Sequence, residues 1–439
     1  MNEILIFSPH TSARLSFVLD FIFNGFTQFP FKLTCDETVF TQFEGAKINY
    51  SEQHFDNALH ILPTGLLQKT SWQNTFPEVD WQNGMPILFP VINSTADLNF
   101  DLFSAIFFLL SRYEEYGSTA KDQFGRFPAT ESIAGKNNFL HLPVVDIWLK
   151  DFLGMIAKQF PAIIFPQKKT QVNFTYDIDG AYAFKGRSLF RQLGAIGNDL
   201  LRGNFLRQIE RFKVLLGLQK DPFDNYDFIT ENGINPIFFF LLHQKLTTQD
   251  RNIHPKKNLL RKLIKDIAQL FPIGIHPSFP SSVDTALLQS EKETLEQISG
   301  QKITKNRQHY LRFSWPSTYQ QLLKNGILEE YSMGYTKQPG FRASTCTPFY
   351  FFDLEKNETT ALKIFPLCIM EATFRDTLKL PLQEALNIFI QYFETVKNVQ
   401  GHFMCIWHND TLQPSKGNGD KNFRWLHNQI VEYIRSNQL

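Results

Sequence analysis

The chain has 439 residues, of which 43% are hydrophobic and 20% are charged, and this composition excludes an intrinsically disordered protein. Its 44 lysines and arginines almost balance its 43 aspartates and glutamates, so the net charge of +1 predicts no general attraction to nucleic acid or membranes. Because a chain of this length exceeds one ordinary hydrophobic core, we expect two domains.

The first residues, MNEILIFSPHTSARLSFVLDFIF, do not resemble a secretory signal. Glu3 stands where a signal peptide has basic residues, and no small-residue cleavage site follows. No apolar run approaches the roughly 20 residues of a membrane-spanning helix. The cysteines form no C-x-x-C pair, which favours reduced core thiols over a zinc–thiolate site: Cys35, Cys346, Cys368 and Cys405. We therefore expect a cytoplasmic protein without a transmembrane segment.

Residues 1–165 lack a regular alternation of strands and helices. Two helices are predicted within them, over 100–117 and over 143–160. The stretch 161–171 contains two prolines and a lysine pair, a composition typical of a connection. We therefore predict a smaller α/β domain over residues 1–165 and a second domain over residues 166–439.

From about residue 170 onward, short apolar strands alternate with helical patterns. The predicted strands cover 172–178, 236–242, 272–278, 309–315, 330–336, 361–371 and 402–410. The predicted helices cover 256–271, 282–299, 316–326, 381–401 and 422–436. This alternation predicts an α/β fold in which helices cover a parallel sheet, either open and doubly wound or barrel-like.

A basic segment, residues 185–220, is a local exception to the neutral charge. Its apolar residues recur at helical spacing, which favours a helix with a solvated basic face. An acidic ligand or an anionic surface is the alternative partner for such a segment.

Polar residues gather where the predicted strands end, which is where α/β proteins place their chemistry. Asp177 and Asp179 end the first strand, so their carboxylates share a face and repel unless a cation, a proton or water lies between them. The other candidates are His276, Arg307, His309, Arg312, Arg342, Glu371, His408 and Asp410. A carboxylate and neutral imidazoles would hold a divalent metal that lowers the pKa of bound water toward roughly 7. A second carboxylate would then act as base and a distal histidine as acid.

Each candidate also has a structural interpretation. Asp177 and Asp179 could close a turn after the strand, as Asp commonly does. His276 and His309 could be hydrogen-bonded packing residues, the arginines could form ion pairs, and His408 could belong to a turn. The functional interpretation depends on their occurrence together at strand ends rather than on any one residue.

The order of these segments resembles the NodB-type polysaccharide deacetylases, carbohydrate esterase family four. TYDIDG resembles the first motif of that family, PIFFFLL its second strand, GIHPS its histidine motif and CIWHND its last motif. A divergent branch in bacterial proteins is closer, through TYDID, GIHPS, RQHYLR, SMGY, GFR and MEAT in this order. The resemblance covers roughly residues 165–439. The N-terminal third is similar to the uncharacterised domain that accompanies this branch.

The resemblance implies a distorted (β/α) barrel of about seven strands. It implies hydrolysis of an acetyl group on a saccharide or glycan precursor. It also implies that Asp177 is the general base and His408 the general acid. Arg312 or Arg342 would orient the base or bind the substrate.

The metal ligands implied by the resemblance are Asp179 and His276, with zinc the first choice among divalent ions. The second histidine of the family lies four residues after the first, and Pro280 stands there in this chain. Because catalytic zinc usually has three protein ligands, His309 would have to lie close by in space to complete the set. The two aspartates are separated by one residue where the family has adjacent ones, which could exchange their roles.

Three functions stay open at the level of the sequence. The first is metal-assisted deacetylation of a saccharide. The second is a metal-free, catalytically inactive domain that binds a saccharide or a protein partner. The third is a hydrolase that uses the two aspartates and His408 without a metal.

Overall fold

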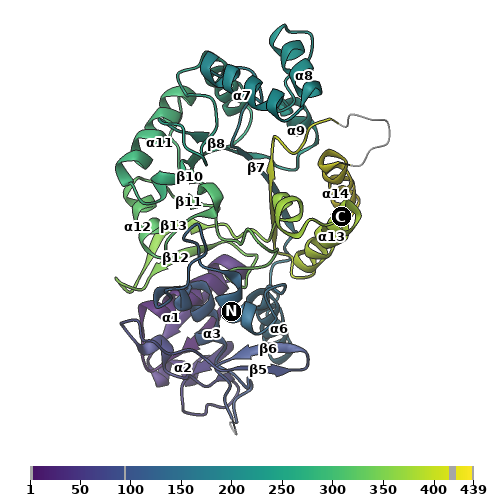
Figure 1. Cartoon of the computed structure of the whole chain (residues 1–439). Helices are drawn as coiled ribbons and strands as arrows, with labels where there is room; N and C mark the ends of the chain where they lie inside the picture. The colour runs from purple at the N-terminus through teal and green to yellow at the C-terminus, as the bar shows by residue number, and fades with distance from the viewer. Residues whose placement is uncertain (1–2, 93–94, 415–421, 438–439) are drawn as a thin grey trace.

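The computed structural model describes residues 3–92, 95–414 and 422–437. These residues form a four-stranded sheet from the N-terminal third and a nine-stranded sheet from the rest of the chain. Figure 1 shows the first sheet and its helices below the second. A separate antiparallel hairpin, β5 (Val79–Gln82) and β6 (Met85–Leu88), also lies in the N-terminal third. Within the described ranges, no helix is both long enough and apolar enough to cross a membrane.

The four-stranded sheet is parallel and has the order β2–β1–β3–β4. Its strands are β1 (Ile4–Phe7), β2 (Phe31–Thr34), β3 (Ala46–Tyr50) and β4 (Leu59–Ile61). All four residues of β1 are apolar and buried, as expected for a parallel strand covered on both faces. The connecting helices are α1 (Ala13–Leu19), which continues into η1 (Asp20–Thr27), and α2 (Glu37–Gln42).

Helix α3 (Leu102–Leu110) joins the N-terminal third to the large sheet. It is buried all round, and the carboxylate of Asp101 caps it by accepting from the backbone N–H of Ser104. It contacts both α1 and β12 (Phe349–Asp353) of the large sheet. The helix predicted over 100–117 is broken at Arg112, where φ is 52°, before α4 (Tyr113–Tyr116). The remaining helices of this third are η2 (Leu66–Gln68), η3 (Ala129–Glu131), α5 (Ile133–Lys136) and α6 (Val144–Gln159).

The nine-stranded sheet has the order β12–β13–β11–β10–β9–β8–β7–β15–β14, and all neighbours are parallel except β12 and β13. The other strands are β7 (Gln171–Ile178), β8 (Ile237–Leu242), β9 (Ile273–Pro277), β10 (Lys305–Asn306), β11 (Glu329–Glu330), β13 (Glu358–Ile364), β14 (Ile369–Met370) and β15 (His402–His408). The prediction of a mixed α/β chain with parallel strands is confirmed. No pairing among the described residues joins β12 to β14, so the sheet is not closed and the barrel stays a prediction.

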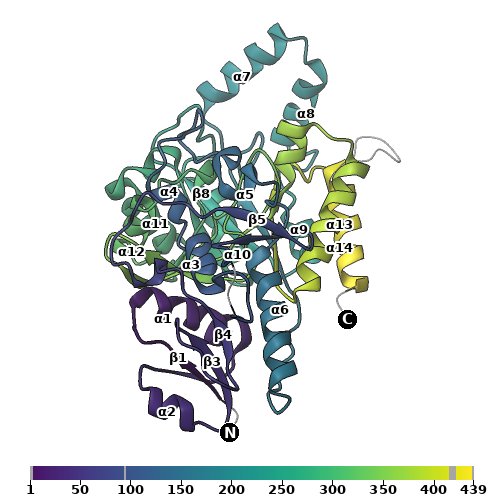
Figure 2. The ribbon, with the colours of Figure 1, turned by 90° about the horizontal axis from the view of Figure 1, so that it is seen from below.

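Helices cover this sheet as the alternating pattern predicts. They are α7 (Leu189–Leu201), α8 (Phe205–Leu215), α9 (Tyr226–Asn232), α10 (Asn258–Ala268), α11 (Thr285–Ser299), α12 (Ser317–Lys324), α13 (Leu382–Asn398) and α14 (Phe423–Asn437). The last five match the predicted helices to within three residues at each end. In Figure 2, α7 and α8 project from the body, whereas α13 and α14 pack side by side against it.

The strand predicted over 309–315 is wrong. That segment holds a single 3-10 turn, η5 (His309–Leu311), in which Tyr310 has a φ of 62°. The strand lies earlier, and β10 ends at Asn306. Because the chain leaves the sheet at this point, the His309 ring reaches the Asp250 carboxylate at 3.0 Å instead of packing within a strand.

Two other predicted strands are shorter than expected. Of the segment 330–336, only its first residue is in a strand, as the end of β11. The segment 361–371 is divided between β13 and β14, and Pro366 lies in the gap, where it has no N–H to donate to a ladder. The strands predicted over 172–178, 236–242 and 272–278 agree with β7, β8 and β9 to within one residue at each end.

A buried histidine in this core predicts acid sensitivity. The ring of His427 on α14 is fully buried and pairs with the Tyr176 hydroxyl at 2.8 Å, and burial lowers its pKa to about 3. The unfolded chain would bind this proton near pH 6.5, so the free energy of unfolding should fall by about 1.4 kcal/mol per pH unit as pH drops from 6.5 toward 3. We expect His427→Gln to flatten this slope, measured by urea unfolding at about pH 7 and about pH 5. An unchanged slope in the variant would show that His427 is not the group responsible. Burial also lowers the pKa of His402 to about 4, and the part of the slope that comes from His402 remains in both proteins.

Candidate active site

Three strands of the large sheet end at one cavity. β15 and β9 lie on either side of β7 and its neighbour β8, and all four are parallel, so their carboxyl ends share one edge. A cavity of about 330 Å³ opens at this edge. The candidate residues that line it are Asp177, Asp179, His276, His309, His408 and Asp410. Sequence segments more than 200 residues apart therefore meet where the strand pattern predicts.

Asp179 lies at the centre of three histidines. Its Oδ1 is 3.1 Å from Nε2 of His276, and its Oδ2 is 3.4 Å from Nε2 of His309. Nε2 of His408 is farther away, at 3.9 Å from the same Oδ2. The structure thus brings together the three residues predicted as metal ligands, with His408 beside them.

The Nδ1 atom of each histidine is held by an acceptor. For His276 it is the backbone carbonyl of Arg307 at 2.5 Å, for His309 the Asp250 carboxylate at 3.0 Å, and for His408 the Glu371 carboxylate at 2.8 Å. Since these oxygens can only accept, Nδ1 carries a hydrogen in each ring. In the neutral rings, Nε2 then has a free lone pair directed at Asp179, which is how metal-binding histidines are oriented in proteins.

The residues present fit a divalent metal ion. One ligand atom from each of Asp179, His276 and His309 lies within 4.8 Å of the others. Zinc bonds of about 2.0–2.1 Å at tetrahedral angles would put ligand atoms roughly 3.3 Å apart. Nε2 of His276 is at a similar distance from Oδ1 of Asp179, 3.1 Å, whereas the 3.4 Å separation of His309 Nε2 runs to the other oxygen, Oδ2. Buried Oδ1 atoms of both Asp177 and Asp179 have no hydrogen-bond donor among the described residues. Three ligands with an open side toward the cavity are typical of catalytic rather than structural zinc.

The contacts between carboxylates and histidines shift the pKa values of the groups in the cluster. Burial opposes ionisation of Asp179, but His309 and His276 outweigh it and hold its pKa well below the usual value. Burial also opposes protonation of His309, yet Asp179 and Asp250 raise its pKa to about 9. For His408, Glu371 outweighs burial and raises the pKa to about 10. A divalent ion bound here would displace protons from the two ligating histidines.

Arg307 lies beside Asp177, where Arg312 or Arg342 was predicted. Its guanidinium is fully buried, with Nη1 3.7 Å from Oδ2 of Asp177 and Nη2 donating to the Thr175 hydroxyl at 2.9 Å. It also lies over the ring of Phe239, 5.0 Å from the centroid. Arg307 therefore places a buried positive charge beside Asp177. The sequence singles out Arg307 as a strand-end candidate without a role; it lies one residue past the end of β10, where its backbone N–H donates to the carbonyl of Ile275 in β9.

The two arginines predicted to orient Asp177 bond elsewhere. Arg312 donates to the carbonyls of Phe124 and Phe279 at 2.9 Å, and Arg342 forms a bidentate pair with Glu115 at 2.6 and 3.0 Å. Among the described residues, no hydrogen bond or ion pair joins either arginine to Asp177. The expectation that Arg312 or Arg342 orients this carboxylate is corrected accordingly, because the early end of β10 leaves Arg307 on the site side. A role of either arginine in substrate binding stays a prediction.

Two carboxylates position histidines of the cluster; the sequence singles out Glu371 as a candidate without a role, and it does not single out Asp250. Glu371 directly follows β14 and also accepts the backbone N–H of His408 at 2.9 Å. Asp250 lies in the long connection between β8 and α10, where no periodic pattern marks it, and it also accepts from Phe279. The loop of the N-terminal third adds Phe124 and Arg126 to the cavity wall.

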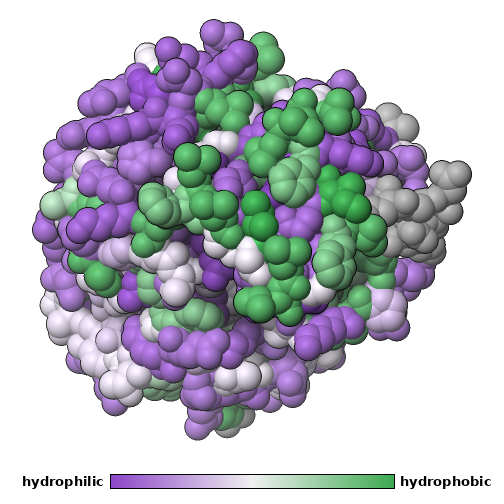
Figure 3. All heavy atoms as spheres, turned by 45° about the horizontal axis from the view of Figure 1, so that its top comes forward, coloured by the Kyte–Doolittle hydropathy of each residue, from purple (hydrophilic) through white to green (hydrophobic). Residues whose placement is uncertain are grey.

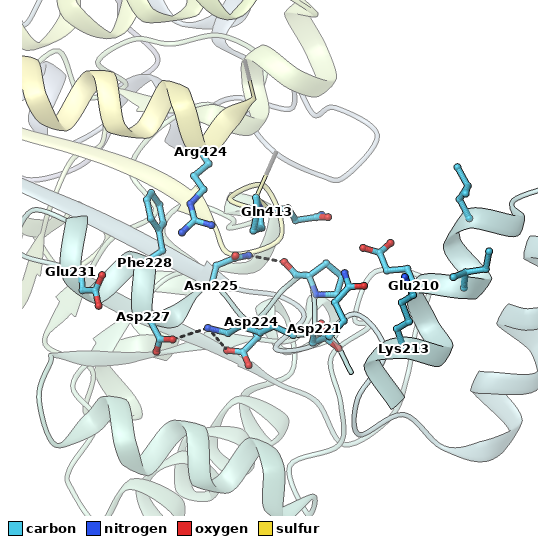
Figure 4. A pocket seen from close by; sticks show the side chains of 16 residues that line it. Glu210, Lys213, Asp221, Asp224, Asn225, Asp227, Phe228, Glu231, Gln413 and Arg424 are labelled. Atoms are coloured by element: carbon cyan, nitrogen blue, oxygen red, sulfur yellow. Dashed lines mark hydrogen bonds and ion pairs between the residues drawn. The ribbon is translucent and has the colours of Figure 1, made fainter. Parts of the chain in front are cut away.

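A larger cavity lies apart from this cluster. It measures about 710 Å³ and is formed by α8, α9 and the residues around Gln413 and Arg424 (Figure 4). Charged side chains of both signs surround it, including Lys213, Asp224 and Asp227. None of the candidate metal ligands lines it. Size alone therefore does not identify the site of chemistry, and the paired histidines and carboxylates favour the smaller cavity.

Comparison with known proteins gives limited information. Residues 4–161 match a family of unknown function, DUF7033. No curated protein matches the chain. A solved structure from Mycobacterium smegmatis, provisionally described as a polysaccharide deacetylase, aligns at 13% identity with a TM-score of 0.38 and covers 63% of this chain and 88% of that chain. Neither comparison assigns an activity to this chain.

Proposed function

We propose that this chain is a metal-dependent hydrolase that removes an acetyl group from a saccharide. The observation that carries the proposal is the set of anchored ligands, Asp179, His276 and His309, beside a second buried carboxylate, Asp177. A bound divalent ion, zinc first, would polarise the acetyl carbonyl and acidify a water molecule. The order of motifs along the sequence favours an acetylated saccharide as substrate and a distorted (β/α) barrel as the fold.

The residues that would transfer protons during hydrolysis, Asp177 and His408, are different from the three that would hold the metal ion. Asp177 takes the proton of the attacking water, and the buried guanidinium of Arg307, 3.7 Å away, orients this carboxylate. His408 donates a proton to the leaving nitrogen or oxygen as acetate separates, and Glu371 holds its ring in position. The base and the acid come from the neighbouring strands β7 and β15, so a substrate between them would meet both.

The proposed domains are residues 1–165 and 166–439, supported by their separate sheets. The N-terminal domain would contribute to the active-site cavity, because Phe124 and Arg126 line it. Arg126 donates to the backbone carbonyl of Tyr310 at 2.8 Å, next to His309. The cytoplasmic location stays a prediction.

The second candidate is a metal-free domain that binds a saccharide or a protein partner without catalysis. It is favoured by the pairing of protonated His309 with both Asp179 and Asp250. In this state the positive charge of the histidine balances the negative charge of Asp179 without a metal ion. Metal content separates the two candidates.

Metal removal should abolish activity. We expect the protein purified without chelator to retain about one divalent ion per chain, measured by plasma mass spectrometry, as the three ligands predict. Treatment with a chelator should stop acetate release from an N-acetylated chitooligosaccharide and an O-acetylated xylan, and zinc should restore it. If no divalent ion copurifies or binds at micromolar concentration, the metal-free candidate replaces the hydrolase.

A further inference from the structure

Helices α7 and α8 form a hairpin that stands out from the body (Figure 2). Three residues, 202–204, connect the helices, and Gly203 takes the left-handed conformation with a φ of 68°. Val214 of α8 packs with Ala183 and Phe184 at the base of the hairpin. The start of α7 is attached as well, since Arg191 donates to the backbone carbonyls of Arg251 and Asn252.

The inner side of the hairpin is polar. Arg211 is 1% exposed, and its guanidinium donates to Asp199 at 2.6 Å and to Gln192 at 3.1 Å. Gln208 donates to the same Asp199 carboxylate at 3.2 Å. These four buried side chains join the two helices through hydrogen bonds and an ion pair rather than through apolar packing.

The outer side of the hairpin is apolar. Its large side chains are exposed to a degree that is rare for leucine and phenylalanine in water: Leu189 81%, Phe190 89%, Leu201 91%, Leu206 82%, Leu216 72% and Leu218 75%. Figure 3, which brings the top of Figure 1 forward, shows hydrophobic side chains gathered on this face with hydrophilic ones between them. The hairpin therefore reverses the usual order, with polar groups inside and apolar groups outside.

Basic residues surround the apolar face. Residues 185–220 contain eight lysines and arginines and two acidic residues; of the basic ones, Arg211 lies inside the hairpin paired with Asp199, and Lys220 pairs with Asp227 at 2.7 Å. Arg202 and Lys213 are exposed, and Lys213 lies with Leu206 at the wall of the larger cavity beside α8. The partner of this face must accept apolar side chains and neutralise positive charge at the same time.

We propose that the α7–α8 hairpin docks the protein on an anionic lipid surface, with the leucines and phenylalanines in the acyl boundary and the arginines and lysines at the headgroups. A helical segment with a large apolar face and basic flanks is the kind that lies in a membrane interface. A second copy of this chain fits less well, because two such faces would bring like charges together. This proposal is independent of the proposed hydrolysis.

The test uses the full chain and sedimentation with vesicles. We expect binding to vesicles of equimolar phosphatidylcholine and phosphatidylglycerol, weaker binding to phosphatidylcholine alone, and weakening as salt is raised. The variant Phe190→Ser, Leu201→Ser, Leu206→Ser should bind on the order of 100-fold more weakly, since it removes three inserted side chains. Arg202→Gln with Lys213→Gln should weaken binding about 30-fold.

A matched control replaces three exposed apolar residues outside the hairpin, Ile164→Ser, Leu270→Ser and Val283→Ser, and should bind as the parent does. All variants should keep the urea midpoint of the parent, because the replaced side chains are exposed. Equal binding to both vesicle types, or no binding to either, would overturn the proposal. So would self-association in solution that the hairpin variant abolishes, since this would assign the face to a second copy.

Discussion

Replacement of Asp179 by Asn should remove both metal binding and hydrolysis. Asn has the same size, but its NH₂ group cannot coordinate, its carbonyl oxygen carries no negative charge, and His276 and His309 lose the charge that they face. Because a bound metal contributes several kcal/mol to stabilisation of the transition state, we expect acetate release to fall by at least about 10³-fold. Mass spectrometry of the purified variant should find less than stoichiometric metal.

The matched control for this substitution is Asp376→Asn. Asp376 lines the same cavity, pairs with Arg375 at 2.7 Å and is more than half exposed, so its loss should change the rate only a few-fold. Circular dichroism should show the same fold for both variants. If Asp179→Asn retains metal and full activity while Asp376→Asn loses them, the assignment of the ligands is wrong.

The ends of β7, β8 and β9 were predictable because this part of the chain alternates strands and helices in a regular way. A short apolar run such as IFFFLL of β8 is typical of a central strand in a parallel sheet, and parallel pairing then places the ends of its neighbours at the same edge. The meeting of Asp177, His276 and His408 was therefore accessible from the sequence. The closure of the sheet was not, since strand order along the chain does not say whether its two edges pair.

The role of Arg307 was not accessible in the same way. Which side of a strand a residue faces depends on where the strand ends, and an error of one residue reverses it. The apolar pattern HYLRFSW placed the strand over 309–315, whereas β10 covers only Lys305–Asn306. Asp250 was missed for another reason: it lies in an irregular connection, and only the folded chain brings it to His309.

The ion pair between Glu115 and Arg342 was likewise beyond sequence patterns, and its loss should be the largest effect on stability. The two residues are 227 positions apart and join α4 of the N-terminal third to the segment after β11. Glu115 also accepts from Arg112, and its side chain is 3% exposed. The arginine of the pair packs over the ring of Phe313, 4.2 Å from the centroid. We expect Glu115→Gln to lower the free energy of unfolding by about 3–5 kcal/mol, because the Arg342 guanidinium would stay buried without its carboxylate, whereas Arg112 keeps Glu114 at 2.6 Å.

Urea unfolding measures this effect, and Asp266→Asn provides the comparison. Asp266 pairs with Lys262 on the surface, where both side chains are more than half exposed, so its loss should cost less than about 1 kcal/mol. Burial would raise the pKa of Glu115, but Arg342 and Arg112 outweigh it and lower the value below 4.5. The stabilisation by this pair is therefore complete above about pH 4.5 and is lost only as pH falls through the lower folded pKa. Equal costs of the two substitutions at neutral pH would mean that apolar packing of α3, rather than this ion pair, holds the N-terminal third on the large sheet.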